Sequence, residues 1–158
     1  MSVPTDPYYE DLTGVWPYDP KKAKQLIDDA GLTVEEFTFT VPNLPYAQEA
    51  SELLYSQLRD VGFRVRLETV EFPAVWLNTV LKQADYQASI VAHVEPRDMG
   101  NLFANPNYYL GYDSARVREL IQAGDVESMR LAVDQIMGDA AALTLVNAPN
   151  IVDRKSVV

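Results

Sequence analysis

Residues 37–68 read FTFTVPNLPYAQEASELLYSQLRDVGFRVRLE, and two alternating segments in this stretch enclose a helical one. Around Phe37 and again around Val65, apolar side chains alternate with polar ones, which is the pattern of a strand with one buried face. Apolar residues recur at helical spacing over about 45–61, and Gly62 ends that run. A strand, a helix and a strand of these lengths predict a βαβ unit with a right-handed parallel crossover.

Similar patterns continue on both sides of this unit. Asp19 is a good helix N-cap, Pro20 suits the first helical position and Gly31 suits the end, which predicts a helix over 20–30. Further patterns predict a helix at 73–84, a strand buried on both faces at 88–92, helices at about 114–123 and 126–141, and a last strand around Leu143, Leu145 and Ile151. Residues 1–18 have no sustained period, and we expect an extended segment whose aromatic side chains lie on the rest of the chain.

The order of these elements predicts an α/β fold with a mixed or mainly parallel sheet flanked by helices. With 158 residues the chain is long enough for one core and short for two ordinary domains. No repeat or linker divides it. We therefore expect a single α/β domain over 1–158.

Composition argues against several classes of function. The 13 Lys and Arg residues against 23 Asp and Glu residues give a net charge of -10, which opposes binding to nucleic acid. The absence of cysteine excludes disulfides and thiolate chemistry, and a single histidine, His93, argues against multi-histidine metal centres. No apolar run is long enough to span a bilayer, and residues 1–6 do not resemble a signal peptide.

Two segments carry a family resemblance. Residues 7–31, PYYEDLTGVWPYDPKKAKQLIDDAG, and residues 47–76, AQEASELLYSQLRDVGFRVRLETVEFPAVW, resemble the peptide/nickel type of bacterial extracellular solute-binding proteins, family 5. In order and spacing the resemblance covers about residues 4–150. It implies one lobe of a periplasmic-binding-protein type II fold, corresponding to the second large lobe of these proteins. Members of the family are longer, with a signal or lipoprotein peptide and a first lobe ahead of the matched region.

The function implied by this resemblance is transport rather than catalysis. The chain would be the substrate-binding lobe of an ABC-importer receptor that captures a peptide-like or other small solute by closing with its missing N-terminal lobe. The solute would pass to an ABC permease, and the parent protein would be secreted or lipid-anchored, at the extracellular face or in the periplasm. No cofactor or metal is implied. The alternative is a small acidic protein-interaction module that shares only the fold.

The loop after the predicted strand at 88–92 is the first candidate binding site, because ligands of open α/β sheets lie beyond the carboxyl ends of strands. In peptide-binding members of the family an acidic residue here holds the α-ammonium group of the ligand, and that position corresponds to Glu95. A carboxylate suits the role through a charge-assisted hydrogen bond. The alternative is a solvated acid paired with Arg97. The family often has Asp at this position and a Trp at the position of Ala92, so this chain implies a different ligand shape.

Five further residues are candidate ligand contacts. His93 would face the same site, although a lone histidine is more often packed in a core. Asp98 follows in the same loop, and a glycosidase-like carboxylate pair with Glu95 has no support from spacing. The irregular segment 93–112 contains Tyr108 and Tyr109, for which ligand contact and packing are equally open. Trp76 lies on the apolar stripe of its predicted helix, which favours core over ligand contact. The chain also lacks the Gly-x-Ser-x-Gly motif of a serine hydrolase.

Overall fold

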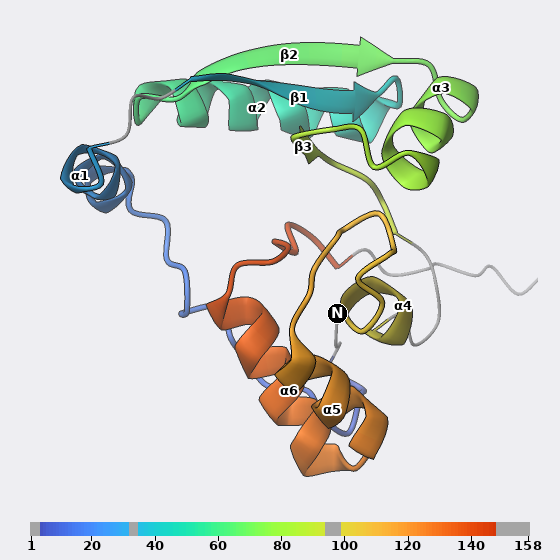
Figure 1. Cartoon of the computed structure of the whole chain (residues 1–158). Coiled ribbons are helices and arrows are strands. Elements are labelled where there is room, and N and C mark those ends of the chain that lie inside the picture. The colour runs from blue at the N-terminus through green and yellow to red at the C-terminus, as the bar shows by residue number, and fades with distance from the viewer. Residues whose placement is uncertain (1–3, 32–34, 94–98, 148–158) are drawn as a thin grey trace, which may run out of the picture.

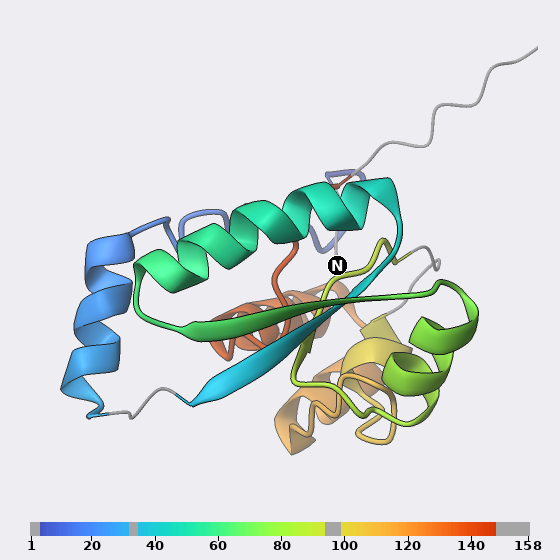
Figure 2. The ribbon, with the colours of Figure 1, turned by 90° about the horizontal axis from the view of Figure 1, so that it is seen from above.

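The computed structural model describes residues 4–31, 35–93 and 99–147 (Figure 1). A small parallel sheet with one long helix forms the upper part in this view, and three helices from the C-terminal half form the lower part. Figure 2 shows the same arrangement from above, with the long helix lying along the sheet. The segment after the third strand leads from the upper part to the lower one.

The βαβ unit predicted from residues 37–68 is confirmed. Strands β1 (Glu36–Pro42) and β2 (Arg64–Val70) pair in parallel, and α2 (Pro45–Asp60) connects them. The alternating apolar side chains of both strands face α2, and they form what we call the sheet cluster. Its buried members are Phe39, Val41, Ala47 and Val65, with Leu54, Leu58 and Ile90 among the half-buried residues packed against them.

Strand β3 (Ala88–Ser89) completes the sheet in the order β2-β1-β3, parallel to β1. The prediction of a strand over 88–92 that is buried on both faces is wrong in length and burial, since two half-buried residues form the ladder. Side chains replace the missing backbone pairing. The Ser89 hydroxyl donates to the Thr40 carbonyl at 2.7 Å, and the Gln87 side-chain oxygen accepts from the Thr38 amide at 2.7 Å.

The helix expected at 73–84 lies where predicted but combines two helix types. One turn of α-helix, α3 (Ala74–Trp76), continues into a π-helix, η1 (Leu77–Lys82). In the π-helical part the amide of Gln83 donates to the carbonyl of Asn78, five residues earlier. The predicted apolar stripe is confirmed, because Trp76 and Val80 are buried.

Three helices form the lower part of the molecule. They are α4 (Met99–Phe103), α5 (Ala115–Ala123) and α6 (Val126–Gly138). Helices α5 and α6 confirm the predictions, although α6 ends earlier than expected, whereas α4 lies within a segment expected to be irregular. The buried side chains here, which we call the helical cluster, are Trp76, Val80, Met99, Leu102, Phe103, Tyr109, Val117, Val133 and Ile136. None of the helices in the described residues is long and apolar enough to cross a membrane.

Helix α1 (Pro20–Asp29) begins as predicted, but its apolar stripe is not buried. The Asp19 carboxylate accepts a hydrogen bond from the Lys22 amide at 2.9 Å and so caps the helix. Leu26 on the stripe remains 52% exposed, and no residue of the helix is buried. Figures 1 and 2 agree that α1 lies beside the C-terminal end of α2, away from the lower helices.

The predicted last strand is absent from the described residues. Leu143 is 62% exposed, Leu145 and Val146 are exposed too, and residues 143–147 form no ladder. An alternating pattern buries its apolar face only beside a neighbouring strand, and none of the described strands pairs with this segment. Ile151 lies outside the described residues.

The N-terminal segment is irregular, as expected, but only some of its aromatic residues lie on the rest of the chain, since Tyr18 is 76% exposed. Tyr8 and Leu12 pack against the helical cluster. Trp16 donates its indole N–H to the Met137 carbonyl at 2.6 Å, and Arg130 donates to the Pro7 carbonyl at 3.3 Å. These contacts fasten the start of the chain to α6.

The N-cap of α6 leads to a testable pH dependence. Ser128 donates from its hydroxyl and from its amide to the Asp125 carboxylate, and these two bonds hold the pKa of Asp125 below its ordinary value. The stabilisation is therefore fully present above the ordinary pKa of an aspartate and is lost as pH falls through the lower folded-state pKa. We expect Asp125→Ala to lower the melting temperature at neutral pH and to bring it close to that of the wild type in acid.

Thermal unfolding followed by circular dichroism from neutral to acid pH checks this expectation. Asp134→Ala is the matched control, because Asp134 is an exposed acid on the same helix to which no hydrogen bond is assigned. A drop for Asp125→Ala that does not change with pH would contradict the role of the carboxylate as a cap.

Candidate functional site

The carboxyl ends of the parallel strands meet at one edge of the sheet. Asn43 follows β1 there, Tyr46 lies in the first turn of α2, and residues 90–93 follow β3. The side-chain oxygen of Asn43 accepts from the Phe72 amide at 2.9 Å and so ties the end of β1 to the segment that follows β2. This is the edge at which open α/β sheets bind ligands.

Residues 90–93 join the two clusters of the molecule. Ile90 packs against the sheet cluster and Val91 against the helical cluster. The amide of Ala92 donates to the hydroxyl of Tyr46 at 2.8 Å. His93 Nδ1 then lies 3.4 Å from the hydroxyl of Tyr109, which belongs to the lower part. We call residues 90–93 the seam, because successive residues bind alternately to the upper and lower parts.

Aromatic side chains with polar tips gather on the lower side of the seam. The ring centroids of Tyr108 and Tyr109 are 4.8 Å apart, and those of His93 and Tyr109 are 6.3 Å apart. Tyr109 is only 8% exposed, whereas Tyr108 and His93 are half-buried. The hydroxyl of Tyr86 donates to the Tyr109 carbonyl at 2.8 Å, and burial raises the pKa of Tyr86. The structure therefore brings together three of the predicted candidates, His93, Tyr108 and Tyr109.

The two acidic candidates, Glu95 and Asp98, lie outside the described residues, as does Arg97. Their roles stay predictions. In the described residues, no group of three acidic or histidine side chains is arranged to hold a metal ion.

Trp76 belongs to the core. It is 2% exposed, and its indole N–H donates to the Ser89 hydroxyl at 3.1 Å. The same hydroxyl donates to the Thr40 carbonyl, so Trp76, Ser89 and Thr40 form a chain of hydrogen bonds behind the seam. This burial favours the core interpretation of Trp76 over ligand contact.

Tyr112 is also held by the protein itself. Its hydroxyl donates to Asp139 at 2.7 Å, and Gln135 donates to the other oxygen of that carboxylate at 2.8 Å. Burial is the main cause that raises the pKa of Tyr112, and the hydrogen bond to Asp139 also raises it. The same hydrogen bond lowers the pKa of Asp139. These hydrogen bonds tie Tyr112 to the C-terminal end of α6.

The hydroxyl of Ser89 gives a prediction for stability. In Ser89→Ala, the buried indole N–H of Trp76 and the Thr40 carbonyl both lose their partner, so we expect the free energy of unfolding to fall by about 2 kcal/mol. Ser56→Ala on the exposed side of α2 is the control and is expected to change it by less than about 0.5 kcal/mol. Urea unfolding monitored by circular dichroism measures both, and equal values would show that the hydrogen-bond chain does not stabilise β3.

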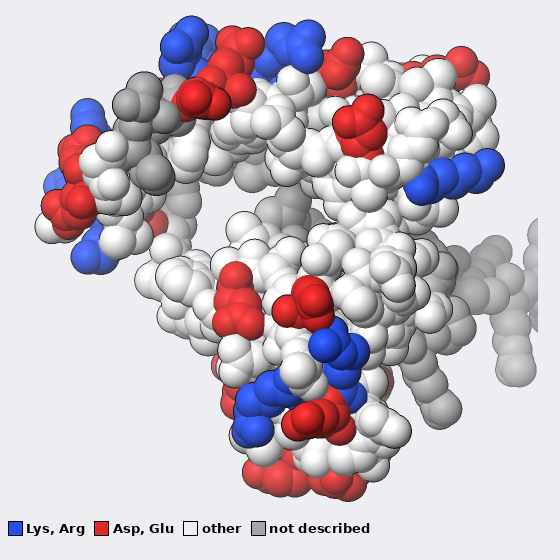
Figure 3. Space-filling model, viewed as in Figure 1, with Lys and Arg blue, Asp and Glu red and all other residues white. Residues whose placement is uncertain are grey.

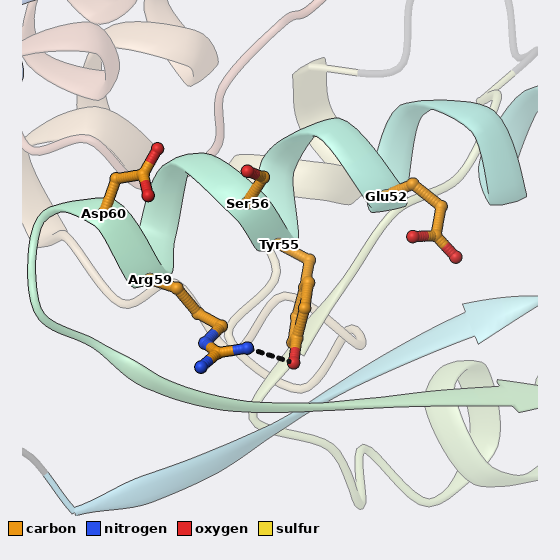
Figure 4. A pocket seen from close by; sticks show the side chains of 5 residues that line it. All are labelled: Glu52, Tyr55, Ser56, Arg59 and Asp60. Carbon is orange, nitrogen blue, oxygen red and sulfur yellow. Dashed lines mark hydrogen bonds between the residues drawn. The ribbon is translucent and has the colours of Figure 1, made fainter.

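A shallow pocket lies on α2 at the opposite end of the sheet. It is lined by Glu52, Tyr55, Ser56, Arg59 and Asp60, and Figure 4 shows Arg59 and Tyr55 joined by a hydrogen bond of 3.1 Å. The pocket is open and mixed in charge. It lies toward the end of α2 and the start of β2, away from the carboxyl ends of the strands. We therefore place the candidate site at the seam and not here.

Figure 3 shows an open space between the upper part and the lower helices on the side of α1. Sequence reasoning missed the contact of Tyr46 with the seam, because its place on the apolar stripe of α2 indicated packing alone. The signal available was its position in the first helical turn after a strand, directly following Pro45.

A family comparison identifies the class of protein. The family model of bacterial extracellular solute-binding proteins, family 5 Middle, matches residues 1–111. The chain belongs to this family. The resemblance seen in the sequence is thereby confirmed, and family 5 proteins are extracellular or periplasmic solute-binding proteins rather than enzymes. No curated protein matches the chain.

Solved structures confirm the fold of this family 5 chain. DppA from Helicobacter pylori, in complex with peptide STSA, matches with a TM-score of 0.69 and 21% identity over 88% of this chain and 31% of that protein. CtaP from Listeria monocytogenes, an ABC transporter substrate-binding protein, matches with a TM-score of 0.66 and 22% identity over 85% of this chain and 30% of that protein. NikZ from Campylobacter jejuni, in complex with Ni(L-His), matches with a TM-score of 0.65 and 14% identity over 80% of this chain and 31% of that protein.

These matches establish the α/β fold class as that of type II periplasmic binding proteins. In the described residues the sheet is wholly parallel, which narrows the prediction of a mixed or mainly parallel sheet. The chain spans about a third of the length of the three structures. A single domain over 1–158 remains a prediction.

Proposed function

We propose that this chain is a substrate-binding lobe of a family 5 receptor that captures a peptide-like solute and delivers it to an ABC permease. The observation that carries the proposal is the seam, where hydrogen-bonding side chains of two packed layers converge at the carboxyl ends of parallel strands. Family membership adds that solute binding is the activity to expect at such a place. The interaction-module alternative is not favoured, because no observation points to a protein partner in place of a solute.

Residues on and beside the seam are the proposed contacts. His93 and the half-buried Tyr108 present polar atoms from the lower part, and Tyr109 orients His93. Glu95 supplies a carboxylate for a cationic group such as a peptide α-ammonium, and Asp98 adds a second acid nearby in sequence. Trp76 supports β3 from the core and is left out of the contact set.

Binding proceeds by closure of two lobes around the solute, because contacts to both lobes select the closed state. This chain supplies one lobe, and the N-terminal lobe of a longer protein supplies the other. The exposed apolar residues at 143–146 are consistent with further protein packing there. We further propose that the longer protein is secreted or lipid-anchored, which matches the location of the family.

Calorimetry and thermal shift on the longest natural protein that contains this chain test the proposal. The panel contains peptide STSA, a random tetrapeptide mixture, oligosaccharides and the nickel-histidine complex. We expect micromolar or tighter binding to the peptides and a melting temperature that rises with peptide concentration. Binding to oligosaccharide or nickel-histidine alone would correct the solute class, and no binding to any member would refute the receptor function.

A further inference from the structure

Helix α1 stands apart from both clusters of the molecule. No residue of α1 is buried, and none belongs to the sheet cluster or to the helical cluster. Its apolar stripe consists of Ala23, Leu26 and Ile27, and Leu26 is 52% exposed. A helix of ten residues is marginal on its own in water and gains most of its stability when its apolar face packs on a partner. In the described part of the chain, the stripe of α1 has no such partner.

The charges of α1 run against the dipole of the helix. Lys21 and Lys22 lie in its first turn, and Asp28 and Asp29 lie in its last turn. Acidic residues at the start of a helix and basic residues at its end are the stabilising arrangement, so this order is the less favourable one. Among the described residues, none is assigned a side-chain bond to Lys22 or to Asp29. The charge order of α1 therefore calls for a cause outside the helix itself. Figure 3 shows both kinds of charge on its surface.

An antiparallel pair of α1 helices from two copies of the chain would satisfy these charges. Lys22 and Asp29 are seven residues apart, which is close to two helical turns, so both lie on the same side of α1, beside the apolar stripe. When two such helices run antiparallel about a two-fold axis, Lys22 of each copy lies opposite Asp29 of the other. The two stripes then cover each other, and the opposed helix dipoles attract. Any other partner would have to supply the same charges in the reverse order, whereas a second copy already carries them.

We propose that α1 is a self-association surface, through which two copies of the protein pair by antiparallel contact of their α1 helices. The inference goes beyond solute binding and does not depend on it. The interface is small, because a helix of ten residues offers less than the roughly 800 Å² per partner of a standard interface. We therefore expect a reversible dimer with a dissociation constant of about 10–100 µM at low salt, weakened by added salt because the ion pairs are exposed.

Sedimentation velocity on the longest natural protein that contains this chain measures the pairing, over a concentration series that brackets this range. Leu26→Gln keeps a good helix former and removes the apolar contact at the centre of the stripe. We expect this variant to dimerise at least about tenfold more weakly than the wild type, because both copies lose a buried side chain. Self-association that Leu26→Gln leaves unchanged would place the contact elsewhere and overturn the inference.

Charge reversal gives the sharper test. Lys22→Asp and Asp29→Lys each replace two attractive pairs by two repulsive ones, so we expect either variant alone to dimerise about tenfold more weakly at low salt. Both substitutions introduce the charge that the helix dipole favours, so α1 itself is not destabilised. In an equal mixture of the two variants, opposite charges again face each other in the mixed dimer. We expect the mixture to recover about the wild-type affinity.

Arg116→Asp is the matched control, because Arg116 is an exposed basic residue in the first turn of another helix, α5. This variant is expected to associate as the wild type does, and equal weakening by Arg116→Asp and Lys22→Asp would overturn the inference in favour of a general effect of net charge. A mixture that associates no better than its two components would overturn the antiparallel pairing. A wild type that stays monomeric throughout the series would also overturn it, and would leave the receptor function standing.

Discussion

Trp76→Ala is expected to lower the free energy of unfolding by about 3–5 kcal/mol, which is a large share of the stability of a domain this size. The indole is 2% exposed and lies in the helical cluster, with Phe72 in tilted contact at a ring distance of 5.9 Å. Its removal leaves a cavity and also deprives the Ser89 hydroxyl of a donor. The cluster around it includes side chains from α4, α5 and α6, so we expect loss of cooperative unfolding of the lower part.

The other tryptophan of the chain is the natural control. Trp16 is 54% exposed and keeps one hydrogen bond, to the Met137 carbonyl. We expect Trp16→Ala to cost about 1 kcal/mol, the usual value of one hydrogen bond. Trp76→Phe keeps an aromatic ring and is expected to fall between the two. Urea unfolding followed by circular dichroism ranks the three variants, and equal losses for Trp76→Ala and Trp16→Ala would contradict the core position of Trp76.

The second large effect is expected in solute binding. If Glu95 pairs with a cationic group of the solute, Glu95→Gln leaves that charge without a partner when the lobes close. We expect peptide binding to weaken roughly thirtyfold or more, as for removal of one partner of an enclosed charge pair. Calorimetry on the longest natural protein measures it with peptides that carry a free α-ammonium group.

Two controls make this result specific. Glu119→Gln changes an exposed acid on α5 and is expected to leave binding unchanged. Acetylating the peptide amino group removes the cation, so wild type and Glu95→Gln are expected to bind the acetylated peptide with similar affinity. A full loss for acetylated peptide as well would assign Glu95 a structural role, and wild-type affinity of Glu95→Gln for free peptides would remove Glu95 from the site.

Local sequence rules predicted the elements whose stability is local or whose partners are nearby in sequence. The βαβ unit follows from the alternation around Phe37 and Val65 and the helical spacing between them, because both strands bury the same face against one helix. The N-cap at Asp19 was predictable for the same reason, since a capping side chain binds an amide three residues away.

The errors arise where partners are distant in sequence. Residues 88–92 have the composition of a buried strand, yet side-chain bonds from Ser89 and Gln87 replace most of the ladder. Leu143 and Leu145 alternate as in a strand but have no neighbour in the described residues. The seam could be placed at a strand end from sequence, whereas the bond of Tyr46 to Ala92 could not, because it joins residues 46 apart in the chain.

Solute-dependent closure is the most direct test of the central claim that this chain is one lobe of a two-lobed receptor. Small-angle X-ray scattering on the longest natural protein, with and without saturating tetrapeptide mixture, measures the radius of gyration. We expect the radius to decrease when solute binds, because contacts to both lobes select the closed state. An unchanged radius at a peptide concentration that calorimetry shows to be saturating would contradict closure around the solute.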